Sequence, residues 1–150
     1  MYRQRIRIDP ASSTINRTLS ADRPPMTALN LRTVEAKVFV PARGFELSKR
    51  FYTAIGFAIP WSSDDLAYVH HGDCSSLLQK FYLAQHAQNF QMHLLVENAD
   101  DWWRHLAEQN IAQTFGVDIG APEDRPWMIR DFTLVDPTVV LSRIGHNLPV

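Results

Sequence analysis

A two-residue alternation that gives way to a four-residue period occurs twice in the sequence, and this repeated change most constrains the fold. Residues 33–40 (TVEAKVFV) alternate between two faces, which is typical of a β-strand. In residues 45–57 (FELSKRFYTAIGF), apolar side chains recur at every fourth position from Leu47 to Ile55. Gly56 can take the left-handed conformation that ends a helix. The sequence therefore predicts a strand followed by a helix.

Three short segments complete the first unit. They predict strands at 57–61 (FAIPW), 66–71 (LAYVHH) and 75–82 (SSLLQKFY), the last two joined by a turn at Gly72-Asp73. The order of elements from residue 33 to residue 82 is thus strand, helix and three strands.

The second half of the chain repeats this order. Residues 91–97 (QMHLLVE) alternate, and Asn98 is a good N-cap for a helix. The apolar stripe of that helix, for which packing is the expected role, consists of Ala99, Trp102, Trp103 and Leu106. A displacement of 54 residues places Asn110 where Gly56 stands and Ile111 where Phe57 begins the next strand. We predict an α+β fold of two βαβββ modules, at about 33–82 and 89–146.

The last strands are displaced further. If SSLLQKFY matches TVVLSRIG (138–145), Gln79 corresponds to Arg143, 64 residues later, and module 2 holds ten extra residues. The extra residues fit within 116–127 (GVDIGAPEDRPW), which we predict to be a long loop between the second and third strands of module 2. This loop is either a lid or an accident of sequence drift between the two modules.

Composition excludes several classes of function. A net charge of −1 gives no overall attraction to nucleic acid or to a membrane surface, and no apolar run is long enough for a bilayer. A single cysteine, Cys74, fits a reducing compartment, so a cytoplasmic location is expected. Residues 1–30 carry five arginines without an apolar period and are interpreted as a flexible basic arm.

Two segments resemble the vicinal-oxygen-chelate superfamily, which contains glyoxalases, bleomycin-resistance proteins and dioxygenases. They are GFELSKRFYTAIGF (44–57) and RDFTLVDPTVVLSRIG (130–145), and the likeness spans about residues 33–146. The resemblance implies paired modules that curl into a cup-shaped, barrel-like mixed sheet, and a homodimer. One departure is Val139, which follows the Asp-Pro-Thr turn where glycine is usual in the family.

The resemblance also locates four positions that hold metal ligands in the family's metal enzymes. In this sequence those positions are Lys37, Gln79, Gln91 and Arg143. Two cations and two neutral amides are poor ligands for a divalent metal ion, so no metal and no cofactor are expected. His93 lies two residues beyond the ligand position, and we expect it to line the cup and not to hold a metal.

Strand parity and the rim positions of the tryptophans predict one ligand-binding set. It contains Glu35, Lys37, Phe39, Trp61, Gln79, Phe81, Gln91, His93, Trp127 and Arg143. A Glu35–Lys37 pair would leave Arg143 for an anionic or carbonyl group of the ligand. Without that pair, two cations would favour an acidic ligand, and the sequence leaves both alternatives open.

Three functions fit these residues. The first is a metal-free protein that sequesters a planar drug or metabolite, as bleomycin-resistance proteins do. The second is an enzyme of the same fold, a lyase, isomerase or dioxygenase with rearranged ligands, or a metal-free enzyme that uses His93 as a base. The third is a fold relative that binds an unknown metabolite. The residues at the four ligand positions favour binding over catalysis.

Overall fold

The computed structural model describes residues 29–149, so the predicted basic arm lies almost entirely outside the described residues. The chain divides at Val34 into two units. Residues 29–34 of the first unit have no regular secondary structure and are exposed. The second unit, which begins at Glu35, contains every helix and strand of the described chain.

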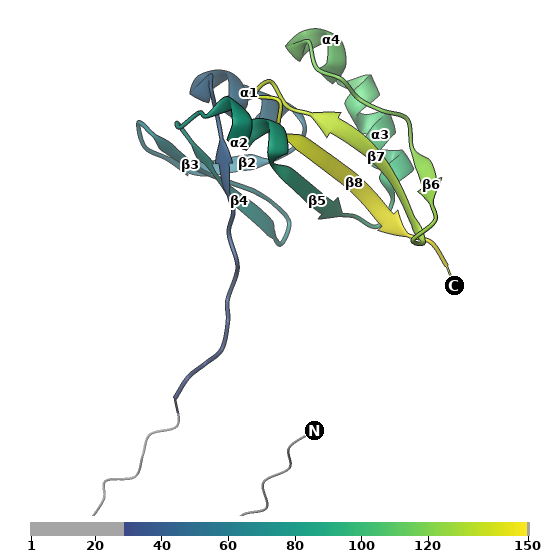
Figure 1. Cartoon of the computed structure of the whole chain (residues 1–150), viewed down its shortest axis with the longest axis horizontal. Helices are drawn as coiled ribbons and strands as arrows, with labels where there is room; N and C mark the ends of the chain where they lie inside the picture. Colours follow the sequence, from purple (N-terminus) through teal and green to yellow (C-terminus); the bar gives the residue numbers. More distant parts are fainter. Residues whose placement is uncertain (1–28, 150) are drawn as a thin grey trace, which may run out of the picture. The chain divides into compact units, whose positions relative to one another are not determined.

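Module 1 forms one four-stranded sheet, sheet A, with one helix after its first strand (Figure 1). Its elements are β1 (Phe39–Pro41), α1 (Phe45–Ala54), β2 (Ala58–Ser62), β3 (Leu66–His71) and β4 (Cys74–Gln79). The strand order is β1-β4-β3-β2, with β1 parallel to β4 and the other neighbours antiparallel.

Module 2 forms sheet B with the same topology, β5-β8-β7-β6, and β5 is likewise parallel to β8. Its elements are β5 (Gln91–Leu95), α3 (Ala99–Glu108), α4 (Ile111–Phe115), β6 (Glu123–Arg125), β7 (Ile129–Val135) and β8 (Leu141–Asn147). A short helix, α2 (Ala84–Asn89), links the modules. α3 begins 54 positions after α1, so the predicted repeat of a βαβββ unit is confirmed.

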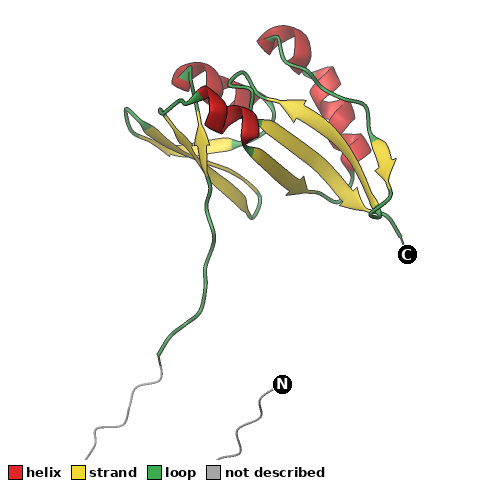
Figure 2. Cartoon of the chain, in the orientation of Figure 1, coloured by secondary structure: helices red, strands yellow, loops and turns green. Residues whose placement is uncertain are grey.

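The core lies on the helix side of both sheets. Val40, Val69 and Leu78 of sheet A are fully buried, as is Phe132 of sheet B. The helices, red in Figure 2, join the modules. Phe51 of α1 meets the Phe115 ring of α4 at 5.3 Å, edge to face. Trp102 and Trp103 pack against the same core cluster, as the helix stripe predicted.

The Asp136-Pro137-Thr138 turn ties module 2 to the first helix. The Asp136 carboxylate accepts hydrogen bonds from the backbone N–H groups of Thr138 (2.8 Å) and Val140 (2.9 Å). The Tyr52 hydroxyl of α1 donates to the same carboxylate at 3.2 Å. Burial and the Asp136 charge raise the pKa of Tyr52, which keeps the phenol protonated as a donor. Val139 has a φ of 69°, which explains why glycine suits this place in the turn.

Three helix ends follow their predicted chemistry. The Asn98 side chain accepts a hydrogen bond from the backbone N–H of Asp101 at 3.1 Å, so it caps α3. Gly56 has a φ of 111° and Asn110 a φ of 51°, and both lie in the left-handed region where the helices of the two modules end.

Three predicted boundaries are wrong. The strand predicted from residue 33 begins only at Phe39, because β1 pairs with β4 over three residues and residues 33–38 are exposed. Ile111–Phe115, equated with a strand by the repeat, is helix α4, since Asn110 turns the chain into another helical segment.

The third correction concerns residues 116–127, predicted as a loop. The backbone of Asp118 and Gly120 bonds to β7, and Glu123–Arg125 is strand β6, so this segment is an edge strand interrupted near Pro122. Proline is tolerated at such an edge because it has no N–H to donate. The segment therefore extends sheet B.

Candidate functional site

Each sheet has an open face, defined as the face turned away from the module's helix. On sheet B the α3 helix packs against β7 and β8 through contacts such as Ala99 N–H to His146 Nδ1 at 2.9 Å. Even-numbered residues of β5, β7 and β8 point to that helix, and odd-numbered residues point to the open face. The predicted ligand-binding residues on these strands, Gln91, His93 and Arg143, therefore share the open face of sheet B.

The open face of sheet A carries an apolar row that crosses all four strands. The register places Trp61 beside Tyr68, Tyr68 beside Leu77 and Leu77 beside Phe39. Trp61 and Phe39 are 52% and 48% exposed. The Tyr68 ring also stacks on His70 at 5.6 Å, with 17° between the planes. Tyr68 was missed from the sequence because its place beside Trp61 depends on strand register.

Lys37 lies over this row, with Nζ 5.3 Å from the centre of the Tyr68 ring. Its ammonium pairs with Glu35, so of the two charge arrangements left open by the sequence, the structure shows the paired one. Hydrogen bonds from Lys37 and Ser75 hold the pKa of Glu35 below its usual value. Glu35 and Lys37 together therefore bring no net charge to the open face of sheet A.

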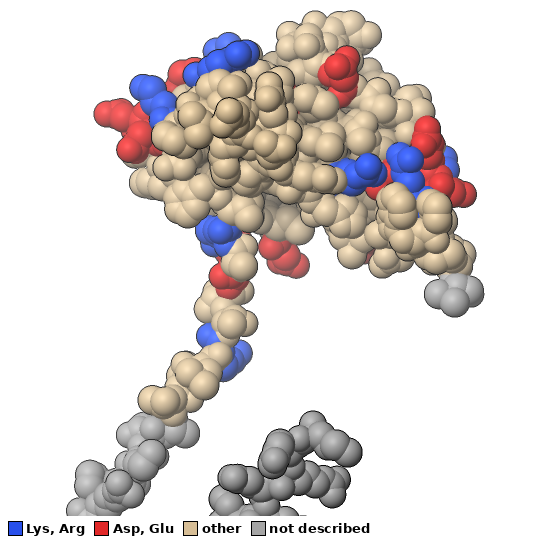
Figure 3. All heavy atoms as spheres, viewed as in Figure 1, with Lys and Arg blue, Asp and Glu red and all other residues tan. Residues whose placement is uncertain are grey.

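The open face of sheet B carries a line of alternating charges. Asp131, whose side chain is 2% exposed, accepts hydrogen bonds from Arg125 Nε at 2.7 Å and from Arg143 Nη1 at 2.8 Å. Arg125 also donates to Glu123 at 2.8 Å. Figure 3 shows basic and acidic side chains next to each other over β6–β8. The prediction left Arg143 without a protein partner; that is wrong, because Asp131 was not recognised from the sequence.

The two arginines keep Asp131 ionised. Burial on its own raises the pKa of Asp131, but the hydrogen bonds and charges of Arg125 and Arg143 outweigh burial and hold this pKa below its ordinary value. The hydrogen bond from Arg125 to Asp131 raises the pKa of Arg125 in turn. All three groups are therefore charged at neutral pH.

The remaining predicted residues lie at the edges of these faces. Gln79 pairs with Leu66 and Pro41 at one end of sheet A, and Phe81, 53% exposed, follows the end of β4. Trp127, 59% exposed, lies in the turn between β6 and β7. The predicted set thus falls into two groups on two sheets, and Trp127 lies at the tip of a hairpin.

The ladder pairs also correct the predicted match of last strands. Phe39 pairs with Leu77, and its counterpart in module 2, His93, pairs with Arg143. Arg143 therefore corresponds to Leu77 and not to Gln79, because ladder partners, unlike sequence patterns, fix the register.

The donor set does not fit a metal ion. Lys37 and Arg143 are engaged in ion pairs, and their cationic groups would repel a divalent cation. Within residues 29–149 no three His, Cys, Asp or Glu side chains are grouped to hold a metal. No step of a reaction through a bound metal follows from these residues.

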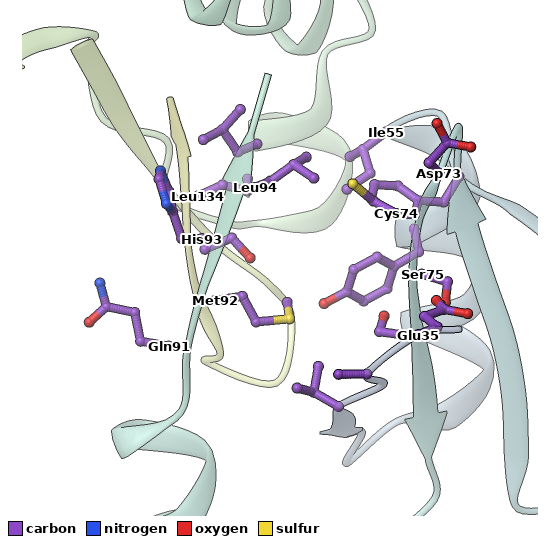
Figure 4. A pocket seen from close by; sticks show the side chains of 17 residues that line it. Glu35, Ile55, Asp73, Cys74, Ser75, Gln91, Met92, His93, Leu94 and Leu134 are labelled. Carbon is purple, nitrogen blue, oxygen red and sulfur yellow. The ribbon is translucent and has the colours of Figure 1, made fainter. Parts of the chain in front are cut away.

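A separate pocket of about 450 Å³ lies between the modules (Figure 4). Its walls are mainly apolar and include Tyr52 and Ile55 of module 1 and Met92, Leu94 and Ile144 of module 2. Figure 4 shows Met92 pointing from β5 toward module 1, while Gln91 and His93 point away from the gap. The apolar part of this pocket therefore lies on the helix side of β5, while Glu35, Gln91 and His93 of the predicted binding set also contribute to its lining.

No helix in the described part of the chain is long and apolar enough to cross a membrane.

The structure was compared with known proteins. No family model and no curated protein sequence matches the chain. Among solved structures, a bleomycin-binding protein complexed with bleomycin is similar, with a TM-score of 0.65, 23% identity, and coverage of 77% of this chain and 99% of that one.

Two further structures extend the likeness. The bleomycin-binding protein of Streptomyces verticillus, complexed with copper(II)-bleomycin, has a TM-score of 0.65 at 18% identity and covers 81% of this chain and 100% of its own. Lactoylglutathione lyase from Agrobacterium tumefaciens has a TM-score of 0.57 at 11% identity, covering 77% and 94%. The chain thus has the fold that these bleomycin-binding and glyoxalase structures share.

Proposed function

We propose that this protein is a small-molecule binder, related in mode of action to bleomycin-resistance proteins, which holds a planar compound without a metal ion. The observation that carries the proposal is the row Trp61–Tyr68–Leu77–Phe39 on the open face of sheet A. Aromatic side chains that remain about half exposed offer a flat surface on which a planar ligand can stack.

The electrostatics of the same faces support binding without metal chemistry. Lys37 and Arg143, which the sequence placed at metal-ligand positions, are each paired with a carboxylate of the protein. The similar structures include bleomycin-binding proteins complexed with bleomycin and with copper(II)-bleomycin, and we infer a planar drug or metabolite as the ligand here.

We also propose that the binding cup is completed in a homodimer. β5 is the end strand of sheet B and β1 the end strand of sheet A, so each sheet has an edge that no strand of the described chain covers. Leu95 on β5 and Phe39 on β1 are 53% and 48% exposed at these edges. Exposed apolar edges of this kind are commonly covered by a second chain.

Titration calorimetry and tryptophan fluorescence test the binding proposal. Bleomycin and a panel of planar aromatic compounds are titrated into the full chain, and at least one is expected to bind with one site per protomer. Trp61→Leu is expected to weaken that binding about tenfold through the loss of stacking. Leu83→Ala, at a residue 55% exposed outside both sheets, is the control. Equal affinity of the two variants would contradict the proposed site.

Metal analysis tests the proposal that the protein acts without a metal ion. Protein dialysed against zinc, nickel and iron(II) salts and then desalted is expected to retain far less than one equivalent of metal. One tightly held equivalent, together with turnover of a substrate, would favour an enzyme of the same fold.

A further inference from the structure

We propose that Arg143, on the open face of sheet B, binds an anionic group of the ligand, a carboxylate or a similar oxyanion. This inference rests on the proposed function and assigns its ligand to a chemical class: a planar compound that carries an acidic group. The proposal follows from how the charges on sheet B are shared.

The ionic groups of sheet B form a line with two different ends. Glu123 pairs with Arg125, Arg125 with Asp131 and Asp131 with Arg143. Arg125 pairs with two carboxylates, those of Glu123 and Asp131. Among the described residues, Arg143 pairs only with Asp131, which also pairs with Arg125. The positive end of the line is therefore at Arg143, in the middle of the face, and the negative end is at the exposed Glu123 near the edge.

The guanidinium of Arg143 keeps donors for a second partner. Within the part of the chain that the structure describes, Arg143 donates through Nη1 alone, so Nε and Nη2 have no acceptor. Its side chain is 29% exposed, which makes these donors accessible from the open face. A guanidinium that is fixed by one carboxylate binds a second oxyanion with little loss of side-chain entropy.

The neighbours of Arg143 suit an oxyanion. The ladder places His93 on one side of Arg143 and Thr133 on the other, all three on the open face. The imidazole N–H of His93 and the hydroxyl of Thr133 are further hydrogen-bond donors on this face. On sheet A, by contrast, Lys37 is already neutralised by Glu35. Arg143 is thus the open-face cation best placed to meet a charge on the ligand.

Gly145 shows that the position of Asp131 is fixed. A Cβ at residue 145 would stand 2.8 Å from the Cβ of Asp131 and 3.0 Å from the carbonyl oxygen of Arg130. Only glycine leaves room for the Asp131 side chain at this point of the β7–β8 pair.

Three naphthalene compounds of matched shape test the inference. They are 1-naphthoate, 1-naphthalenemethanol and 1-naphthylmethylammonium, titrated into the full chain by calorimetry at neutral pH. The acid is expected to bind roughly tenfold to a hundredfold more tightly than the alcohol, because a charge-assisted pair replaces a neutral contact. The ammonium compound is expected to bind more weakly than the alcohol.

Two variants separate binding from structural support. Arg143→Gln is expected to remove the preference for the acid and leave the affinity for the alcohol within about twofold. Arg125→Gln also leaves Asp131 with one arginine, but it keeps Arg143, so the preference is expected to persist. Thermal unfolding of both variants confirms that they are folded to the same extent.

The outcomes distinguish a failure of the anionic ligand class from a failure of the proposed stacking site. Equal binding of all three compounds would leave a planar-ligand binder but overturn the anionic class. Loss of the acid preference in Arg125→Gln as much as in Arg143→Gln would show a purely structural role for Arg143 and also overturn it. If none of the three compounds binds, the anion site and the stacking site that supports the proposed function are both overturned.

Discussion

Asp131 is a buried carboxylate that depends on two arginines for its charge, which makes its effect on stability depend on pH. Asp131→Asn is expected to lower the free energy of unfolding by about 2 kcal/mol at pH 7, since Arg125 and Arg143 then face each other without a carboxylate between them. Urea unfolding at a series of pH values measures this difference.

The pH dependence has a definite sign. Because the folded pKa of Asp131 is depressed below 3.8, its ionic stabilisation is complete above that value and is lost as the pH falls through the folded pKa. The gap between wild type and Asp131→Asn should therefore narrow toward pH 3. Asp124→Asn, at a side chain 62% exposed in the same hairpin, is the control and should change little at any pH. A gap that stays constant from pH 7 to pH 3 would contradict the ion-pair explanation.

At Gly145 an added Cβ would meet three atoms within 3.0 Å, one of them a backbone oxygen. Gly145→Ala is expected to destabilise the protein by about 1–3 kcal/mol, because one of the clashing atoms is a backbone oxygen that cannot move without distorting β7. Gly44→Ala is the comparison, since its new Cβ would meet nothing nearer than 3.5 Å. The two variants should have clearly different midpoints of chemical denaturation. Similar midpoints would show that β7 and β8 shift to accommodate a Cβ at residue 145.

At the scale of elements, α3 shows how a local signal can decide a boundary. Asn98→Ala removes the acceptor for the Asp101 N–H and is expected to cost about 1 kcal/mol of stability. Asn98→Ser keeps an acceptor at the cap and should recover most of that loss. Thermal melts of both variants test the cap, and a serine variant as unstable as the alanine variant would contradict it.

Elements with strong local signals were predicted well, and elements set by their partners were not. The strand Leu66–His71 and the helix stripe of α3 were predicted because periodicity is local. β1 is shorter than its alternation predicts because a strand ends where its pairing with β4 ends. α4 was missed because five residues hold too little periodicity to separate a helix from a strand.

At the scale of the whole molecule, the sequence predicted which strand residues share a face but not the partners of their side chains. Parity placed Gln91, His93 and Arg143 on one face of sheet B, because side-chain direction depends only on position within a strand. Tyr68 and Asp131 were missed because their neighbours are set by register across strands that are distant in sequence. The resemblance to one superfamily predicted the paired modules, and the structural comparisons confirm that fold.

The last prediction concerns assembly, which the uncovered edges at β1 and β5 make testable. A homodimer that covers β5 should unfold at a temperature that rises with protein concentration, because unfolding is then coupled to dissociation. Leu95→Lys places a charge on the exposed edge of β5 and is expected to weaken the dimer at least tenfold by light scattering after size exclusion.

Leu83→Lys is the matched control, because Leu83 is 55% exposed, against 53% for Leu95, but lies outside both sheets. It should leave the dimer intact. A dimer that resists Leu95→Lys would mean that a surface other than the β5 edge joins the protomers. A monomer at all concentrations would contradict the proposed homodimer.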